Sequence, residues 1–144
     1  MRLAAALPLA IVALCLAGSR FSAAEGIEHF VFLGHSVGKT VEFSYYFDAC
    51  GDTATGARLR RLALRKLEAC ELPEDRKQAI RDNVAALSVQ MDAHVKSCDS
   101  DPDCALGKRQ YCPGLARQKA EFAGLMDEAE SSQPALDRLT GGCN

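Results

Sequence analysis

Residues 73–98 read PEDRKQAIRDNVAALSVQMDAHVKSC and carry the clearest helical pattern of the chain. Their apolar side chains recur three or four residues apart and so share one helical face: Ile80, Val84, Leu87, Met91, His94 and Cys98. Pro73 suits the first position of a helix, and Glu74 and Asp75 suit the positive end of its dipole. The pattern predicts a long amphipathic helix whose apolar stripe needs a partner helix.

Two further segments have helical patterns with recognisable ends. Apolar residues recur at helical spacing among the arginines of residues 53–70, which predicts a second amphipathic helix with Thr53 or Thr55 as its N-cap. Near the C-terminus, the Gln-Pro pair at 133–134 starts a short helix, and the Gly-Gly pair at 141–142 ends it.

A proline divides the region between these helices. The Asp-Pro-Asp sequence at 101–103 combines an N-cap, a first-turn proline and a first-turn acid, and predicts a short helix over residues 102–111. We expect the Pro-Gly pair at 113–114 to break that helix and a further helix to cover residues 115–130.

Residues 25–50 fit two patterns. Apolar and polar side chains alternate from residue 41 to residue 48, which favours a strand paired with residues 30–33 in a short N-terminal hairpin. The aromatic residues Phe43, Tyr46 and Phe47 also fit one helical face. Because every later segment is helical, we favour a helix ending near Cys50. The predicted fold is all-α, a small bundle of about four helices, with the hairpin over residues 27–47 as the alternative.

The first 24 residues have the three-part form of a secretory signal peptide. Arg2 precedes an apolar run over residues 3–17, and the small residues 22–24, Ser-Ala-Ala, follow. The run is shorter than the roughly 20 residues needed to span a bilayer. We expect cleavage after Ala24, which leaves a single domain over residues 25–144 with no transmembrane segment. The loss of Arg2 and Arg20 lowers the formal net charge from −2 to −4.

Six of the seven cysteines follow the expected cleavage point: Cys50, Cys70, Cys98, Cys104, Cys112 and Cys143. The seventh, Cys15, lies in the apolar run after the bulky Leu14, which disfavours lipid attachment there. An even number of cysteines in an exported chain predicts three disulfides. The tightest spacing is Cys98-x5-Cys104, and the chain has no CxxC pair of the kind that binds zinc. We therefore expect no metal and no cofactor.

The helix order limits how these cysteines can pair. In an up-and-down bundle, four of the six lie at one end, which leaves Cys70 to pair with Cys143 at the other. A helix between Cys104 and Cys112 would hold their Cα atoms about 12 Å apart, too far for a disulfide. Two sets remain for the other four cysteines: Cys50–Cys104 with Cys98–Cys112, or Cys50–Cys112 with Cys98–Cys104.

Two segments resemble ligand-binding motifs but lack residues that those motifs require. Residues 34–40, GHSVGKT, resemble a phosphate-binding loop, but only three residues separate the glycines where that loop needs four. The acidic run at 99–103 lacks the glycine and the final glutamate of a calcium loop. We interpret His94 as a half-buried imidazole with a hydrogen-bond partner.

The balance of 17 basic against 19 acidic residues disfavours binding to nucleic acid.

One basic cluster is a candidate binding surface. Arg58, Arg61 and Arg65 fall on one helical face, in a segment that has no acidic residue between Asp52 and Glu68. This face could dock an acidic partner or anionic lipid headgroups. The alternative is a solvated face balanced by acidic residues elsewhere in the fold.

No catalytic motif such as GxSxG or HExxH is present, and no residue is assigned a catalytic role. We therefore expect a periplasmic or secreted protein that acts without catalysis as a binding, inhibitory or structural accessory module. Its expected partner is another protein or an anionic surface. The alternative is a small secreted hydrolase or lipid-active enzyme with a site assembled from dispersed residues.

Overall fold

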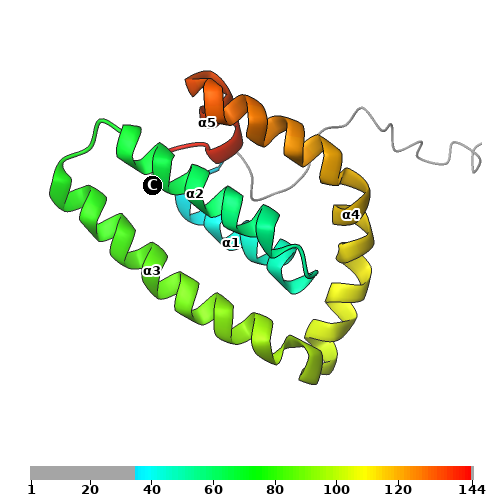
Figure 1. Cartoon of the computed structure of the whole chain (residues 1–144). Helices are drawn as coiled ribbons and strands as arrows, with labels where there is room; N and C mark the ends of the chain where they lie inside the picture. Colours follow the sequence, from blue (N-terminus) through cyan, green and yellow to red (C-terminus); the bar gives the residue numbers. More distant parts are fainter. Residues whose placement is uncertain (1–34, 144) are drawn as a thin grey trace, which may run out of the picture.

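A computed structural model describes residues 35–143 of the chain and is built from helices (Figure 1). They are α1 (Val37–Ala49), α2 (Thr53–Ala69), α3 (Glu74–Ser97), the one-turn 3-10 helix η2 (Cys98–Ser100), α4 (Pro102–Ser131) and α5 (Gln133–Thr140). The all-α prediction is confirmed. The predicted signal peptide, residues 1–24, and the proposed first strand of the hairpin, residues 30–33, lie outside the described residues.

α1 is the central helix of the bundle and is buried on two sides. Phe43 and Phe47 pack against Phe122 of α4 on one side, with ring centroids 5.8 and 4.9 Å from that ring. Val37 and Val41 pack against residues of α2 and α3 on the other side. A helix that is apolar on both sides loses the one-faced pattern of a surface helix, which explains the ambiguity of its sequence. The predicted helix ending near Cys50 is confirmed, and the strand over these residues is wrong.

α2 crosses α1 closely, and its N-cap lies before both of the predicted cap residues. Its N-cap is Asp52, not Thr53 or Thr55: Asp52 Oδ1 accepts a hydrogen bond from the Thr55 backbone N–H at 3.3 Å. Thr55 instead donates its hydroxyl to Asp52 Oδ2 at 2.9 Å. At Gly56, a Cβ atom would lie 2.7 Å from the Ser44 carbonyl oxygen, so the two helices approach where α2 has no side chain.

α4 is one continuous helix, so the predicted break at residues 113–114 is wrong. Pro113 lies inside the helix. Proline has no N–H to donate to the carbonyl four residues back, and its ring crowds that carbonyl, which kinks a helix without ending it when packing holds both halves. Figure 1 shows α4 bending between its yellow and orange parts. The Cys50–Cys112 disulfide on one side of the proline and buried Leu115 on the other tie both halves to the core.

The predicted ends of α4 and α5 are confirmed. The Asp101 carboxylate accepts hydrogen bonds from the backbone N–H groups of Asp103 at 3.0 Å and Cys104 at 3.3 Å. α5 begins at the N-cap Ser132 and ends at Gly141, whose φ of 69° is a conformation that favours glycine.

The disulfides are Cys50–Cys112, Cys70–Cys143 and Cys98–Cys104. The predicted Cys70–Cys143 bridge is confirmed, and the second of the two alternative sets is the one adopted. Two bridges close long loops, with sequence separations of 62 and 73, whereas Cys98 and Cys104 are only 6 residues apart. The long-range bridges tie α1 to α4 and the end of α2 to the C-terminal segment.

α3 packs on α1 by one narrow face. Val84 is its one buried residue, and Ile80, Leu87 and Met91 are half-buried beside it. His94, expected to be half-buried, is exposed because it lies near the end of α3, where the chain turns away into α4. Among residues 35–143, no helix is both long and apolar enough to cross a membrane.

Candidate functional site

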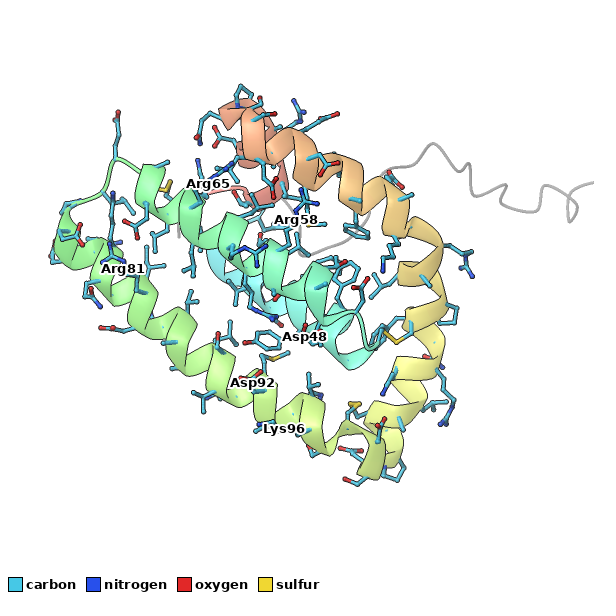
Figure 2. All side chains as sticks on the ribbon, in the orientation of Figure 1. Asp48, Arg58, Arg65, Arg81, Asp92 and Lys96 are labelled. Atoms are coloured by element: carbon cyan, nitrogen blue, oxygen red, sulfur yellow. A yellow bond between two sulfur atoms is a disulfide. The ribbon has the colours of Figure 1, made fainter. Side chains whose placement is uncertain are left out.

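The predicted basic face of α2 lies against the C-terminal end of α4 (Figure 2). Arg58 Nη2 lies 2.6 Å from Asp127 Oδ1, and its Nε lies 2.7 Å from Glu130 Oε1. These hydrogen bonds, first to Glu130 and then to Asp127, raise the pKa of Arg58. The hydrogen bond from Arg58 also holds the pKa of Glu130 below its ordinary value. Arg58 therefore joins α2 to α4.

Arg65 and Arg61 have different surroundings on the same face. Arg65 donates to the main-chain carbonyls of Glu130, at 3.0 Å, and of Ala129, and so satisfies acceptors in the last turn of α4. Arg61 is exposed and forms no ion pair with any residue of the described range. Two of the three candidate arginines thus hold the bundle together, and Arg61 alone is left for an external partner.

A hollow of about 750 Å³ lies between the α1–α2 turn, η2 and the first half of α4. We call it the large hollow. Its floor is apolar: Phe47 and Leu115 are buried beneath it, and Pro113 and the Cys50–Cys112 disulfide form part of its wall. The disulfide fixes the end of α1 against α4, and Pro113 places the bend beside it. No pattern in the sequence indicates this hollow, because its lining residues come from separate elements.

Charged side chains surround the apolar floor. Lys108 Nζ lies 2.7 Å from Asp99 Oδ1, and Lys119 Nζ lies 3.0 Å from Asp52 Oδ2. Burial raises the pKa of Asp52, but hydrogen bonds from Lys119 and Thr55 outweigh it and leave that pKa below its ordinary value.

The remaining cation of the rim is Arg109, which is exposed and has no ion-pair partner among the described residues. The lining thus carries three cations against two carboxylates, and its two ion pairs reach solvent, where such pairs are weak and easily exchanged.

A second, smaller hollow of about 200 Å³ lies on another side of α4, between α1 and α3. We call it the tyrosine hollow, because Tyr45, Tyr46 and Tyr111 line it together with Met91 and the pair His94 and Cys104. The rings of Tyr46 and Tyr111 meet edge to face with centroids 4.9 Å apart. Burial raises the pKa of the Tyr111 phenol, and its interaction with Tyr46 adds to the rise.

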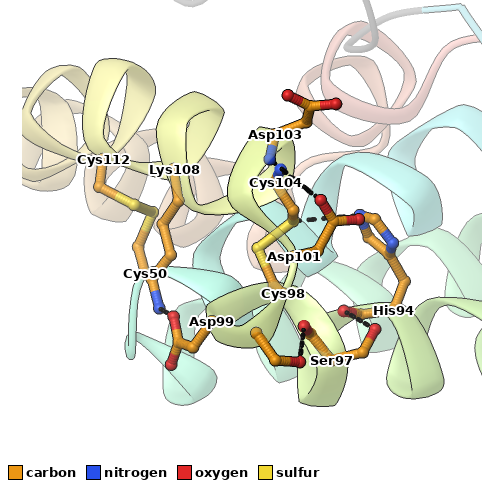
Figure 3. Close-up of a disulfide and its surroundings, with 11 residues drawn as sticks. Cys50, His94, Ser97, Cys98, Asp99, Asp101, Asp103, Cys104, Lys108 and Cys112 are labelled. Atoms are coloured by element: carbon orange, nitrogen blue, oxygen red, sulfur yellow. Dashed lines mark hydrogen bonds and ion pairs between the residues drawn. A yellow bond between two sulfur atoms is a disulfide. The ribbon is translucent and has the colours of Figure 1, made fainter.

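His94 lies beside the short disulfide at the edge of this hollow (Figure 3). Its Nε2 atom is 3.4 Å from Cys104 Sγ. The acidic residues 99–103, which resemble the start of a calcium loop, lie at the same corner. Asp101 caps α4, and Asp99 forms an ion pair with Lys108.

Two other sequence features take structural roles. Ser36 of the phosphate-loop-like segment is the N-cap of α1 and accepts from the Lys39 backbone N–H at 3.2 Å. Lys39 Nζ lies 2.7 Å from Glu42 Oε2, one turn along the same helix.

Compared with known proteins, the chain matches no family model, no curated protein and no solved structure.

Proposed function

We propose that this protein is an exported binding module whose large hollow captures an acidic, partly apolar segment of a partner protein. The observation that carries the proposal is the composition of the hollow: an apolar floor with three cations around it, in a volume of about 750 Å³. That volume falls in the range of pockets that bury most of the surface of a drug-sized ligand.

Arg109 supports the choice of an acidic partner. Its guanidinium has no carboxylate partner among the described residues, and a guanidinium binds a carboxylate through two parallel hydrogen bonds. Lys108 and Lys119 are paired with Asp99 and Asp52 at the solvent boundary, so an incoming carboxylate can compete for either lysine.

Rigidity and location also support a binding role. The Cys50–Cys112 disulfide fixes one wall of the hollow before any ligand arrives, which lowers the entropy lost on binding. Three disulfides are consistent with an oxidising compartment. Together with the signal peptide predicted over residues 1–24, they support a periplasmic or secreted protein.

The proposal can be tested with a fluorescein-labelled peptide of alternating glutamate and leucine. We expect it to bind the oxidised protein, to shift the backbone amide resonances of Gly51, Ala105 and Ala116, and to bind more weakly as salt rises. Arg109→Glu should weaken binding about tenfold or more, as expected for a charge-assisted contact turned repulsive.

Arg61→Glu is the matched control, because Arg61 is an exposed arginine of α2 outside the hollow. It should leave binding close to the wild-type value. Equal binding of a peptide with lysine in place of glutamate would contradict the proposal. Loss of binding in Arg61→Glu but not in Arg109→Glu would instead move the binding surface to the basic face of α2.

A further inference from the structure

The Cys98–Cys104 disulfide differs from the other two in what it holds together. It spans 6 residues within the α3–α4 corner, whereas the others span 62 and 73. In the chain-entropy model, a bridge that closes so short a loop stabilises a fold less than bridges with sequence separations of 62 and 73 do. The corner is also held by the Asp101 cap and by the Asp101 N–H, which donates to the Ser97 carbonyl at 3.2 Å. The fold therefore depends least on this bridge.

The two sulfurs of this bridge are unequally accessible. Cys98 is 1% exposed, whereas Cys104, in the first turn of α4, is half-buried and lines the tyrosine hollow. Thiol–disulfide exchange proceeds by attack of a thiolate on one sulfur, so access selects the sulfur attacked. An incoming thiolate can reach Cys104 from the hollow, whereas Cys98 is buried.

His94 supplies an acid–base group at the accessible sulfur. The imidazole comes from α3, is exposed, and has its Nε2 atom 3.4 Å from Cys104 Sγ (Figure 3). The other charges near this sulfur are those of Asp101, which accepts from the Cys104 N–H at 3.3 Å, Asp103, and Lys108, which is paired with Asp99. The two aspartates next to Cys104 in the chain oppose a thiolate there, and the His94 imidazole is the basic side chain in contact with its sulfur.

We propose that Cys98–Cys104 is a redox-active disulfide that exchanges with cysteine pairs of other proteins, with Cys104 as the attacked sulfur and His94 as its acid–base partner. The tyrosine hollow gives the site a place for an apolar or aromatic side chain next to the reacting cysteine of the substrate.

The exchange takes two steps. A substrate thiolate attacks Cys104 Sγ, the bond between Cys104 and Cys98 breaks, and Cys98 leaves as a thiolate that takes a proton from His94 or water. The second substrate thiolate then attacks the substrate sulfur of the mixed disulfide and releases Cys104 as a thiolate beside His94. The substrate loses two electrons and two protons and becomes a disulfide, and Cys98–Cys104 becomes two thiols. The reverse steps reduce a substrate disulfide.

The first test uses the wild-type chain with limiting dithiothreitol, followed by alkylation and peptide mapping. We expect Cys98 and Cys104 to be alkylated first, while the other two bridges remain intact. Earlier opening of Cys50–Cys112 or Cys70–Cys143 would overturn the assignment. This test needs no substitution, so the stability of a variant does not affect it.

The second test is the rate at which the protein accelerates the reduction of insulin disulfides by dithiothreitol. The double substitution of Cys98 and Cys104 by alanine should abolish the acceleration, and His94→Ala should lower it about tenfold or more. His35→Ala is the matched control, because His35 is exposed and lies outside both hollows. A wild-type rate no higher than that of the double variant, or equal rates for wild type and His94→Ala, would overturn the proposal.

A third measurement separates acid–base chemistry from a structural role for His94. The alkylation rate of reduced Cys104 should rise with pH at a lower midpoint in the wild type than in His94→Ala, since the imidazolium stabilises the thiolate. Identical midpoints would contradict the role assigned to His94.

Discussion

Gly56 sets how closely α2 can approach α1. The space that a side chain would need is filled by the Ser44 carbonyl oxygen, 2.7 Å from an ideal Cβ position, and by the Asp48 carboxylate. Gly56→Ala should therefore force the helices apart and lower the free energy of unfolding by roughly 1–3 kcal/mol, as overpacking does. Urea denaturation measures the difference.

Gly124→Ala is the control for this prediction. Gly124 also lies in a helix, but nothing stands within 4 Å of its ideal Cβ position. There the gain in helix propensity should raise stability by up to about 1 kcal/mol. If both substitutions stabilised the protein, the close crossing at Gly56 would be contradicted.

Arg60 contacts α1, whereas Arg58 and Arg65 contact α4. Its Nη1 atom lies 2.8 Å from Asp48 Oδ2 and 3.0 Å from Ser44 Oγ, and its guanidinium stacks 4.5 Å from the centre of the Tyr45 ring. The Asp48 side chain is only 10% exposed. Arg60→Met should lower the free energy of unfolding by roughly 1–3 kcal/mol, because it leaves the Asp48 carboxylate without its cation.

Arg61→Met is the matched change at the next residue, which is exposed and has no ion-pair partner in the described range. It should alter stability by no more than about 0.5 kcal/mol in denaturant titration. If Arg60→Met and Arg61→Met lowered the free energy of unfolding by similar amounts, the Asp48–Arg60 ion pair would contribute little to stability.

The sequence does not distinguish these neighbouring arginines. Arg58, Arg60 and Arg65 find their partners on other helices, at sequence separations of 12 to 72 residues. The helical period places Arg58, Arg61 and Arg65 on one face, but it carries no information on which acidic residues tertiary packing brings to that face.

Ion pairs at the surface join α2 to α4 and α5. Arg58 pairs with Asp127 and Glu130, and Lys66 Nζ lies 2.7 Å from Asp137 Oδ1. The hydrogen bond from Arg58 lowers the pKa of Glu130, and the one from Lys66 lowers the pKa of Asp137. Such groups stabilise the fold above their unfolded pKa and lose that contribution as the pH falls through the folded value.

Stability should therefore decrease as the pH falls below about 4.5, the ordinary pKa of a glutamate. Arg58→Met should reduce the part of this loss that comes from Glu130, while Arg61→Met should leave the pH dependence unchanged. Urea titrations at pH 7, 5 and 3 measure both effects. An identical pH dependence in wild type and Arg58→Met would contradict the role of this ion pair.

The helices differ in how far their sequences predict them. The helical period within their own residues predicts α2, α3 and α5. The start signals are less exact, because the N-cap of α2 is Asp52 and Pro73 is the N-cap of α3 and not its first helical residue. α4 does not, because Pro113 is a local break signal that packing of Leu115 and the adjacent Cys112 bridge overrides. The sequence of α1 is ambiguous for a different reason. Because α1 is buried on both sides, it lacks the contrast between one apolar and one polar face on which a helix prediction depends.

Two of the three disulfides contribute to the lining of the large hollow and the tyrosine hollow. Cys50–Cys112 forms a wall of the large hollow, and Cys104 lies at the edge of the tyrosine hollow. Helix order, together with the length of a helix between Cys104 and Cys112, narrows the fifteen possible pairings to two, and the structure adopts one of these. The hollows themselves could not be predicted, because their lining comes from four separate elements.

The pairing of the cysteines is the claim on which the fold, the large hollow and the exchange site all depend. Peptide mapping of the unreduced protein tests it most directly, because protease fragments that remain joined identify each bridge. We predict joined fragments containing Cys50 with Cys112, Cys70 with Cys143, and Cys98 with Cys104. Fragments joining Cys50 to Cys104 and Cys98 to Cys112 would contradict the account.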